Sequence, residues 1–218
     1  MRSLISLDHA RPAADIRAGE PERYESSETT HFSIVHGDGN AVSNTYSLNF
    51  SYGLGLVVQG TGVLLNNSLD DFAAKPGAPN AYGLHGADAN APAPMKRPLS
   101  SMSPTIVLRD GKVELVTGSP GGSRIITIVL QIILDLMDHG LNVAEAEAAP
   151  RAHDQLWPDE IRVERGMSAD TIRLLEAMGH KVVVGDAMGS ANTIARSPEG
   201  WLTGAADPRQ RGTLAAGW

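Results

Sequence analysis

The 218-residue sequence contains no cysteine, which excludes disulfides, thiolate metal sites and a cysteine nucleophile. Aromatic residues are also sparse, at 5%, so the core must be built on aliphatic side chains. An excess of basic residues is missing too: 18 Lys and Arg stand against 25 Asp and Glu, for a formal charge of −7. That balance argues against a nucleic-acid-binding protein, and a hydrophobic content of 42% argues against a disordered one.

Long hydrophobic runs are absent as well. The most apolar run, residues 125–137, contains Gln131 and Asp135 and is well short of the roughly 20 residues of a membrane span. It predicts a buried helix. Residues 1–8 are too polar for a signal peptide, so an export signal, if the protein uses one, is expected elsewhere.

Glycine and proline, at 23 and 13 residues, punctuate a mixed pattern of helices and strands. Residues 30–35 and 41–48 alternate around a Gly-Asp-Gly-Asn turn, which predicts a β-hairpin, and residues 105–108 and 113–117 flank an Asp-Gly turn in the same way. Asn142 and Ser168 are predicted helix N-caps. Further strands are expected at residues 60–69, 181–184, 193–195 and 201–204. The sequence therefore predicts an α+β layered domain, with a loop at residues 75–98 that could act as a lid.

One candidate nucleophile is Thr29, where a polar tail meets the first predicted strand. A threonine hydroxyl is a poor nucleophile by itself. If the bond between Glu28 and Thr29 were cut, the new α-amine, with a pKa near 8, would become a general base beside the hydroxyl. The plain alternative is that Thr29 simply begins a strand.

Other polar and glycine-rich segments could bind a substrate. Residues 118–123, GSPGGS, precede the apolar helix, so their backbone N–H groups could hold an oxyanion; an ordinary turn is the alternative. The clusters at residues 66–72 and 100–103 could hold an ammonium and a carboxylate, or simply form turns. The seven histidines lack metal-ligand spacing, so no metal site is predicted.

The order of these motifs resembles the small subunit of the γ-glutamyltranspeptidase family. The motifs are TTHFS at 29–33, NAVS at 40–43, NNSLDDF at 66–72, RPLSSMSP at 97–104 and GSPGGSR at 118–124. The resemblance continues to DPR at 207–209 and covers residues 29–218, while residues 1–28 resemble the C-terminal end of the large subunit. It implies an N-terminal-nucleophile hydrolase fold, an αββα sandwich that a large subunit completes, made from a precursor that cuts itself between Glu28 and Thr29.

The resemblance also implies a reaction and a catalytic group. Thr29 would attack the γ-amide of glutathione or another γ-glutamyl compound, and the resulting ester would pass to water or to the amine of an amino acid or peptide. Ser47 would support the nucleophile, and Gly121 and Gly122 would form the oxyanion hole. No cofactor is implied.

Six further residues match substrate-binding positions of the family. Ser100 and Ser101 would hold the α-carboxylate, Asp71 with Asn49 the α-ammonium, and Tyr82 would close the lid. Ser68 departs from the pattern, because relatives usually carry Gln or Glu there, so its contact with the amino group would be shorter or water-mediated.

The resemblance leaves two alternatives open. A glutaryl or cephalosporin acylase of the same superfamily is disfavoured by Asp71, because a glutaryl group has no ammonium. A non-catalytic, truncated subunit is disfavoured by the intact nucleophile and oxyanion motifs, but the missing large subunit favours it. The implied partners are a large subunit, small-molecule γ-glutamyl donors and amino-acid or peptide acceptors. A periplasmic or secreted location follows from resemblance alone.

Overall fold

The structure, a computed structural model, describes residues 29–80, 84, 86–155 and 158–217. Its strands and helices are β1 (Thr30–Val35), β2 (Ala41–Tyr46), η4 (Ser68–Asp71), η5 (Asp88–Asn90), β3 (Thr105–Arg109), β4 (Lys112–Thr117), η6 (Gly122–Arg124), α1 (Ile125–Met137), α2 (Val143–Ala148), β5 (Ala152–His153), β6 (Ile161–Glu164), α3 (Ala169–Ala177), β7 (Val182–Gly185), β8 (Asn192–Arg196) and β9 (Leu202–Ala206).

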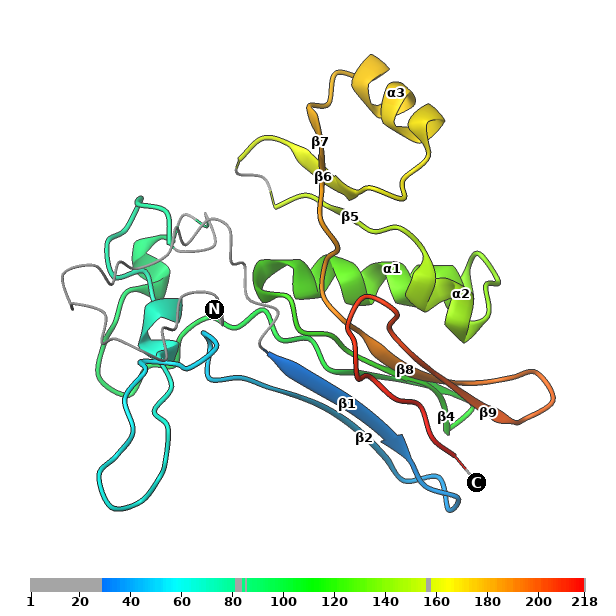
Figure 1. The fold of residues 1–218 in the computed structure, drawn as a ribbon, viewed down its shortest axis with the longest axis horizontal. Helices are drawn as coiled ribbons and strands as arrows, with labels where there is room; N and C mark the ends of the chain where they lie inside the picture. Colours follow the sequence, from blue (N-terminus) through cyan, green and yellow to red (C-terminus); the bar gives the residue numbers. More distant parts are fainter. Residues whose placement is uncertain (1–28, 81–83, 85, 156–157, 218) are drawn as a thin grey trace, which may run out of the picture.

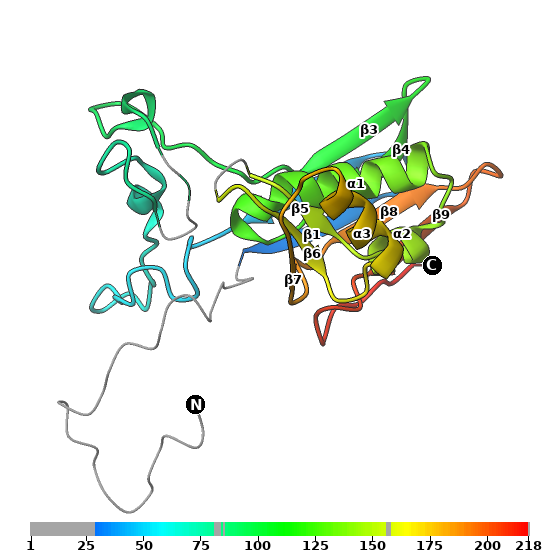
Figure 2. The same ribbon diagram turned by 90° about the horizontal axis from the view of Figure 1, so that it is seen from above.

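The elements form layers. Hairpin β1–β2 lies on one side of the sheet β3-β4-β8-β9, and helices α1 and α2 lie on its other side (Figures 1 and 2). A small third sheet, β5-β6-β7, and α3 lie farther out beyond α1. The α+β layered arrangement predicted from the sequence is therefore confirmed, in the order sheet, sheet, helices.

Both predicted hairpins are present. Thr30 pairs with Tyr46 and Val35 with Ala41 in the antiparallel pair β1–β2. In the β3–β4 turn, Asp110 and Gly111 both have positive φ, 51° and 76°, as an Asp-Gly hairpin turn requires.

The apolar run at residues 125–137 forms α1, as predicted. Its buried side chains are Ile125, Ile128, Val129 and Ile132, spaced at helical intervals. Ile128 and Ile132 form a buried cluster with Met188 and Ala191, from the segment leading into β8. Within the described ranges, no helix is both long and apolar enough to cross a membrane.

The predicted N-caps of α2 and α3 are also observed. The Asn142 side chain accepts a hydrogen bond from the backbone of Glu145, whose carboxylate accepts one in return from the Asn142 N–H, which completes a capping box. Ser168 caps α3 through the backbone N–H of Asp170.

The strand expected at residues 60–69 is wrong. Gly60 and Gly62 adopt positive φ, 80° and 72°, and only an isolated bridge between Val57 and Leu64 forms before the chain turns into η4. Strands β5 and β6 were not predicted; they have only two and four residues, too short for a periodic pattern.

A buried ion network ties α2 to the segment after β9. Arg151, 2% exposed, pairs with Asp207 at 2.8 Å and with Glu147 at 3.2 Å. Arg209 pairs with Glu164 of β6 at 2.6 Å and with Asp207 at 3.1 Å. Burial raises the pKa of Glu147 to about 7 even though Arg151 acts to lower it.

Candidate active site

A pocket of about 100 Å³ lies at the start of β1. It contains eight of the ten residues that the sequence singled out, and these eight lie up to 93 positions apart in the chain. Its lining comprises Thr29, Ser47, Asn49, Ser68, Asp71, Asn80, Leu84, Leu99, Ser100, Ser101, Met102, Gly122, Ser123 and Ile125. Of the other two, Gly121 adjoins Gly122, and Tyr82 lies outside the described residues.

Thr29 and Ser47 are in direct contact at this pocket. The Thr29 hydroxyl donates to Ser47 Oγ at 3.1 Å, and the backbone N–H of Asn49 donates to the same oxygen at 2.8 Å. Asn49 has a φ of 76°, so the chain turns sharply after β2 and brings Ser47 and Asn49 to one side of Thr29. The hydroxyl of Thr29 is thus held in one orientation.

The two glycines lie between β4 and α1, where the chain makes a tight turn. Gly121 has a φ of 142° and Gly122 a φ of 57°, both of which favour glycine. A Cβ on Gly121 would approach Ile128 Cδ1 to 3.1 Å. Ser101 Oγ donates to the Gly122 carbonyl at 2.7 Å, which fixes this turn to the serine pair. The start of a helix carries partial positive charge, so the loop suits a developing oxyanion.

Asp71, on η4, lines the same pocket as Gly122. Burial, followed by the nearby Asp70 carboxylate, raises its pKa above the ordinary range. Asn90 Nδ2 donates to the Asp71 carbonyl at 2.7 Å and holds the backbone of η4. A bound ammonium would relieve this like-charge and desolvation cost, so the carboxyl group is suited to a cationic ligand.

Sequence reasoning missed the structural role of Asn67. This buried side chain accepts from the Phe50 N–H at 2.9 Å through Oδ1 and donates to Asp70 Oδ2 at 3.0 Å through Nδ2. It therefore fixes the segment after β2 against η4. The polar cluster at residues 66–72 was visible in the sequence, but the hydrogen bond between its Asn67 and Phe50 was not.

Ser123 and Asn80 were also not singled out. Ser123 Oγ donates to Gln155 Oε1 at 2.8 Å, which connects the glycine loop to the segment after β5. Asn80 lies in the loop predicted as a lid and reaches the pocket together with Leu84. Across the described part of the chain, no three His, Asp or Glu side chains form a group able to hold a metal ion.

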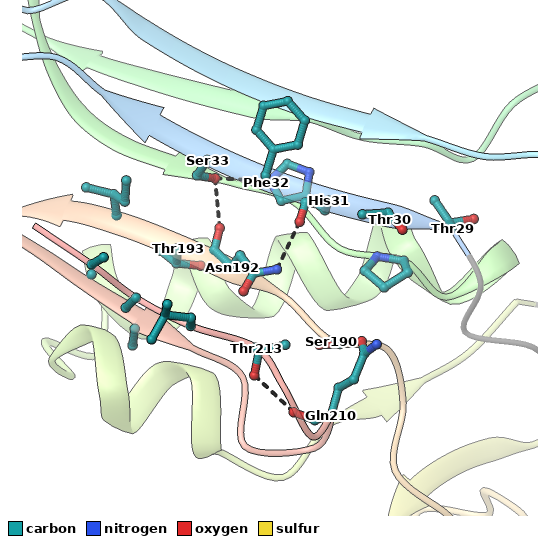
Figure 3. Close-up of a pocket in the computed structure, with 17 residues that line it drawn as sticks. Thr29, Thr30, His31, Phe32, Ser33, Ser190, Asn192, Thr193, Gln210 and Thr213 are labelled. Carbon is teal, nitrogen blue, oxygen red and sulfur yellow. Dashed lines mark hydrogen bonds between the residues drawn. The ribbon is translucent and has the colours of Figure 1, made fainter.

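A second pocket, of about 320 Å³, reaches Thr29 from another side (Figure 3). Its walls come from β1, from β8 with Ser190 before it, and from residues 210–216 near the C-terminal end. Figure 3 shows His31, Ser33 and Asn192 along the wall formed by β1 and β8. Thr29 therefore lies where two pockets meet.

Comparison with known proteins identifies relatives of this chain. A family model described as Gamma-glutamyltranspeptidase matches residues 1–217. The chain is 59% identical over 214 residues to the glutathione hydrolase proenzyme of Escherichia coli strain K12, an alignment that covers 98% of this chain and 37% of that relative. The chain thus spans about two fifths of the length of this relative and of the glutathione hydrolase proenzyme of Pseudomonas sp. strain A14, to which it is 45% identical over 228 residues.

Solved structures show the same likeness. An acivicin-inhibited gamma-glutamyltranspeptidase superposes with a TM-score of 0.80 at 53% identity, covering 84% of this chain and 100% of the other. A cephalosporin acylase from Bacillus halodurans gives a TM-score of 0.74 at 28% identity, covering 86% of this chain and 34% of the other. These matches confirm the expected N-terminal-nucleophile hydrolase fold class.

Proposed function

The chain belongs to the γ-glutamyltranspeptidase family, and from that membership we propose that it is the catalytic portion of an enzyme that hydrolyses and transfers γ-glutamyl groups. The observation that carries the proposal is the Thr29 pocket. One small cavity combines a hydroxyl held by Ser47, a glycine turn before a helix, a carboxyl group and a serine pair. Those are the groups that acyl transfer from an amino-acid donor needs.

The first step of the proposal is autocleavage. The Thr29 hydroxyl attacks the Glu28 carbonyl carbon, the Glu28–Thr29 C–N bond breaks, and an ester joins Glu28 to Thr29 Oγ1. Water then hydrolyses the ester, leaving a Glu28 carboxylate and a free Thr29 amine. The products are residues 1–28, as the end of the large subunit, and residues 29–218, as the small subunit.

The extent of the structural match supports this boundary. Residues 29–218 are 190 of the 218 residues, or 87% of the chain. The whole of the acivicin-inhibited relative's chain is matched by 84% of this one. In that relative, the C-terminus has critical roles in autoprocessing and catalysis.

The mature enzyme would then use Thr29 as both nucleophile and base. Its amine takes the hydroxyl proton as Oγ1 attacks the γ-amide carbon, and backbone N–H groups of Gly121 and Gly122 stabilise the oxyanion. The leaving amine receives the proton, and a γ-glutamyl-Thr29 ester remains. Water or an acceptor amine attacks that ester. One residue supplies nucleophile and base, so the proposed reaction requires neither metal nor cofactor.

Substrate selection rests on two groups at the pocket. Asp71, assisted by Asn49 and Ser68, would bind the α-ammonium, and Ser100 and Ser101 would bind the α-carboxylate. Because the chain is also similar to a cephalosporin acylase, glutaryl amides are the second candidate substrates. The raised pKa of the Asp71 carboxyl favours γ-glutamyl compounds, because an ammonium would compensate the buried charge and a glutaryl group would not.

Asp71→Asn tests this specificity. The variant should lose about 10- to 100-fold in kcat/KM on a γ-glutamyl-anilide, because a charge-assisted hydrogen bond contributes about 1.5–3 kcal/mol. Activity on a glutaryl-anilide should change less than about threefold, since that donor has no ammonium. Asp88→Asn, in the exposed η5, is the matched control. Equal losses on both anilides would contradict the assignment of Asp71.

The outer face of hairpin β1–β2 supports a partner polypeptide. Phe32, Ile34, Val42 and Tyr46 point to this face and are 38%, 51%, 45% and 56% exposed. Helices α1 and α2 cover the four-stranded sheet on the opposite side (Figure 1). We propose that the large subunit covers this apolar face and completes the αββα sandwich, since burial of such surface is worth roughly 25 cal/mol per Å².

Ile34→Asp should weaken that association. When the chain is co-expressed with a tagged large-subunit segment, recovery of the complex should fall at least about tenfold, because the interface would bury a carboxylate without a partner. Leu174→Asp, at an exposed apolar position on α3, should leave recovery unchanged. Equal recovery of the two variants would contradict the proposed interface.

The remaining parts of the proposal rest on family resemblance. We place the enzyme in the periplasm or outside the cell. A non-catalytic, truncated subunit is the weaker alternative, because Thr29, Ser47 and Gly122 retain a pocket geometry suited to catalysis. Intact-mass measurement of the co-expressed chains, together with γ-glutamyl-anilide hydrolysis, separates an uncut inactive chain from a cleaved enzyme.

A further inference from the structure

A buried polar cluster joins hairpin β1–β2 to β8 close to the proposed nucleophile (Figure 3). His31, 4% exposed, contacts Thr45 Oγ1 through Nδ1 at 2.7 Å and Ser33 Oγ through Nε2 at 3.0 Å. Ser33 Oγ also donates to the Asn192 carbonyl at 2.7 Å. No step of the proposed mechanism involves this cluster, although His31 is only two residues from Thr29.

The hydrogen bonds determine the tautomer of His31. Ser33 has one hydroxyl proton, and it goes to the Asn192 carbonyl, so the His31 Nε2–H must donate to Ser33. Nδ1 then carries no proton and accepts from the Thr45 hydroxyl. Burial lowers the pKa of His31 to about 4, which agrees with a neutral ring.

The ring also lies directly against the backbone of Gly118. A Cβ on Gly118 would come within 2.3 to 2.8 Å of three ring atoms, so any larger residue would push the ring away. Asn192 bridges the same two residues: its Nδ2 donates to the His31 carbonyl at 3.0 Å and its backbone N–H donates to the Gly118 carbonyl at 3.2 Å. His31 and Gly118 are thus held together by direct packing and by a shared partner.

These contacts connect the two halves of the proposed catalytic machinery. Thr29 lies two residues before His31 on the same chain segment, and Gly121 lies three residues after Gly118. An oxyanion donor must lie about 2.7–3.1 Å from the developing charge, and a displacement of about 1 Å can cost about 100-fold in rate. We infer that His31 is a positioning residue that sets the separation between Thr29 and the Gly121–Gly122 turn.

This inference rests on the proposed function and deepens it. The proposed substrate-binding residues Asp71, Ser100 and Ser101 take no part in the His31 cluster. Substrate binding is therefore expected to be independent of the cluster. A lost contact of His31 should therefore change kcat and leave KM for the γ-glutamyl donor nearly unchanged.

Ser33 and Ser43 provide a matched pair for the test. They face each other across β1 and β2, and each donates one hydroxyl to a main-chain carbonyl of the four-stranded sheet, Ser33 to Asn192 and Ser43 to Thr117. Of the two, only Ser33 hydrogen-bonds His31. Thr45→Val removes the other partner of His31 at nearly constant volume, and Thr45→Ser restores the hydroxyl.

The experiment measures γ-glutamyl-anilide hydrolysis by each variant co-expressed with the large-subunit segment, with kcat expressed per mole of chain cleaved before Thr29. We expect Ser33→Ala and Thr45→Val to lower kcat about 10- to 100-fold at a KM within about threefold of the original. Thr45→Ser should recover most of the loss, and Ser43→Ala should keep the original kcat even if its melting temperature falls.

Each outcome bears on a different claim. If Ser33→Ala and Ser43→Ala have the same kcat, the cluster is merely structural and the inference is wrong, while the proposed function stands. Should Thr45→Val fail to fold, the comparison of Ser33→Ala with Ser43→Ala alone decides between these outcomes. If the unaltered, cleaved enzyme turns over no γ-glutamyl compound, the proposed function is overturned and the inference falls with it.

Discussion

Replacing Thr29 with alanine should abolish both cleavage after Glu28 and γ-glutamyl hydrolysis. Alanine has no hydroxyl to attack the Glu28 carbonyl, so the chain should keep one uncut mass and no terminal amine would be released. Loss of a nucleophile typically costs at least about 10³-fold in rate, and here the general base would be lost with it. Intact-mass spectrometry and anilide hydrolysis measure the two effects on the co-expressed complex.

The neighbouring residue is the matched control. Thr30→Ala removes an equivalent hydroxyl from an exposed position one residue along and should leave cleavage intact. Thr29→Ser keeps the hydroxyl and should retain part of both activities. A Thr29→Ala chain that still cleaves, or that turns over γ-glutamyl-anilide at the normal rate, would show that another group is the nucleophile.

Arg151→Met should lower the free energy of unfolding by about 3–5 kcal/mol, the usual cost of removing one partner of a buried ion pair. Arg151 is almost fully buried and contacts two carboxyl groups, Glu147 and Asp207, which are themselves fully buried. Without the guanidinium, both carboxyl groups lose a cationic partner. Denaturant unfolding of the intact complex measures the change.

The size of this effect should depend on pH. Burial raises the pKa of Glu147 to about 7, so the folded protein keeps its proton below that value, whereas the unfolded chain releases it near its ordinary pKa of 4.5. The stability contributed by protonated Glu147 is therefore present at low pH and lost as the pH rises through about 7. Glu147 is thus neutral at pH 5 and mostly ionised at pH 8, and it is the ionised carboxylate that the Arg151 guanidinium stabilises. Arg151→Met should consequently cost more stability at pH 8 than at pH 5.

Arg173→Met is the control for this prediction. Arg173 pairs with Asp170 on the exposed surface of α3, so its loss should cost less than about 1 kcal/mol and show little pH dependence. Similar losses for Arg151→Met and Arg173→Met would show that the buried network contributes little to stability.

Much of the fold was predictable because its signals are local. The hairpin turns depend on Gly and Asp residues within four positions of each other, and the caps of α2 and α3 depend on side chains that bond the next turn of the same helix. The strand expected at residues 60–69 failed because alternating residues do not reveal that Gly60 and Gly62 take left-handed φ values. Strand β6 is stabilised by its parallel partner β7, which lies 18 residues away or more, so no local pattern marks it.

The sequence by itself determined the family resemblance and the chemical types of the candidate groups, because the order of short motifs and the identity of Thr29 are properties of the chain alone. Only the tertiary structure decided that Thr29, Asp71 and Gly122 line one pocket, since they come from segments that meet through packing. It likewise decided the state of His31. A histidine in a sequence has no fixed tautomer or pKa. Here burial lowers the pKa of His31, and the tautomer follows from Thr45 on β2 and from Ser33 on β1, whose own proton goes to Asn192 of β8.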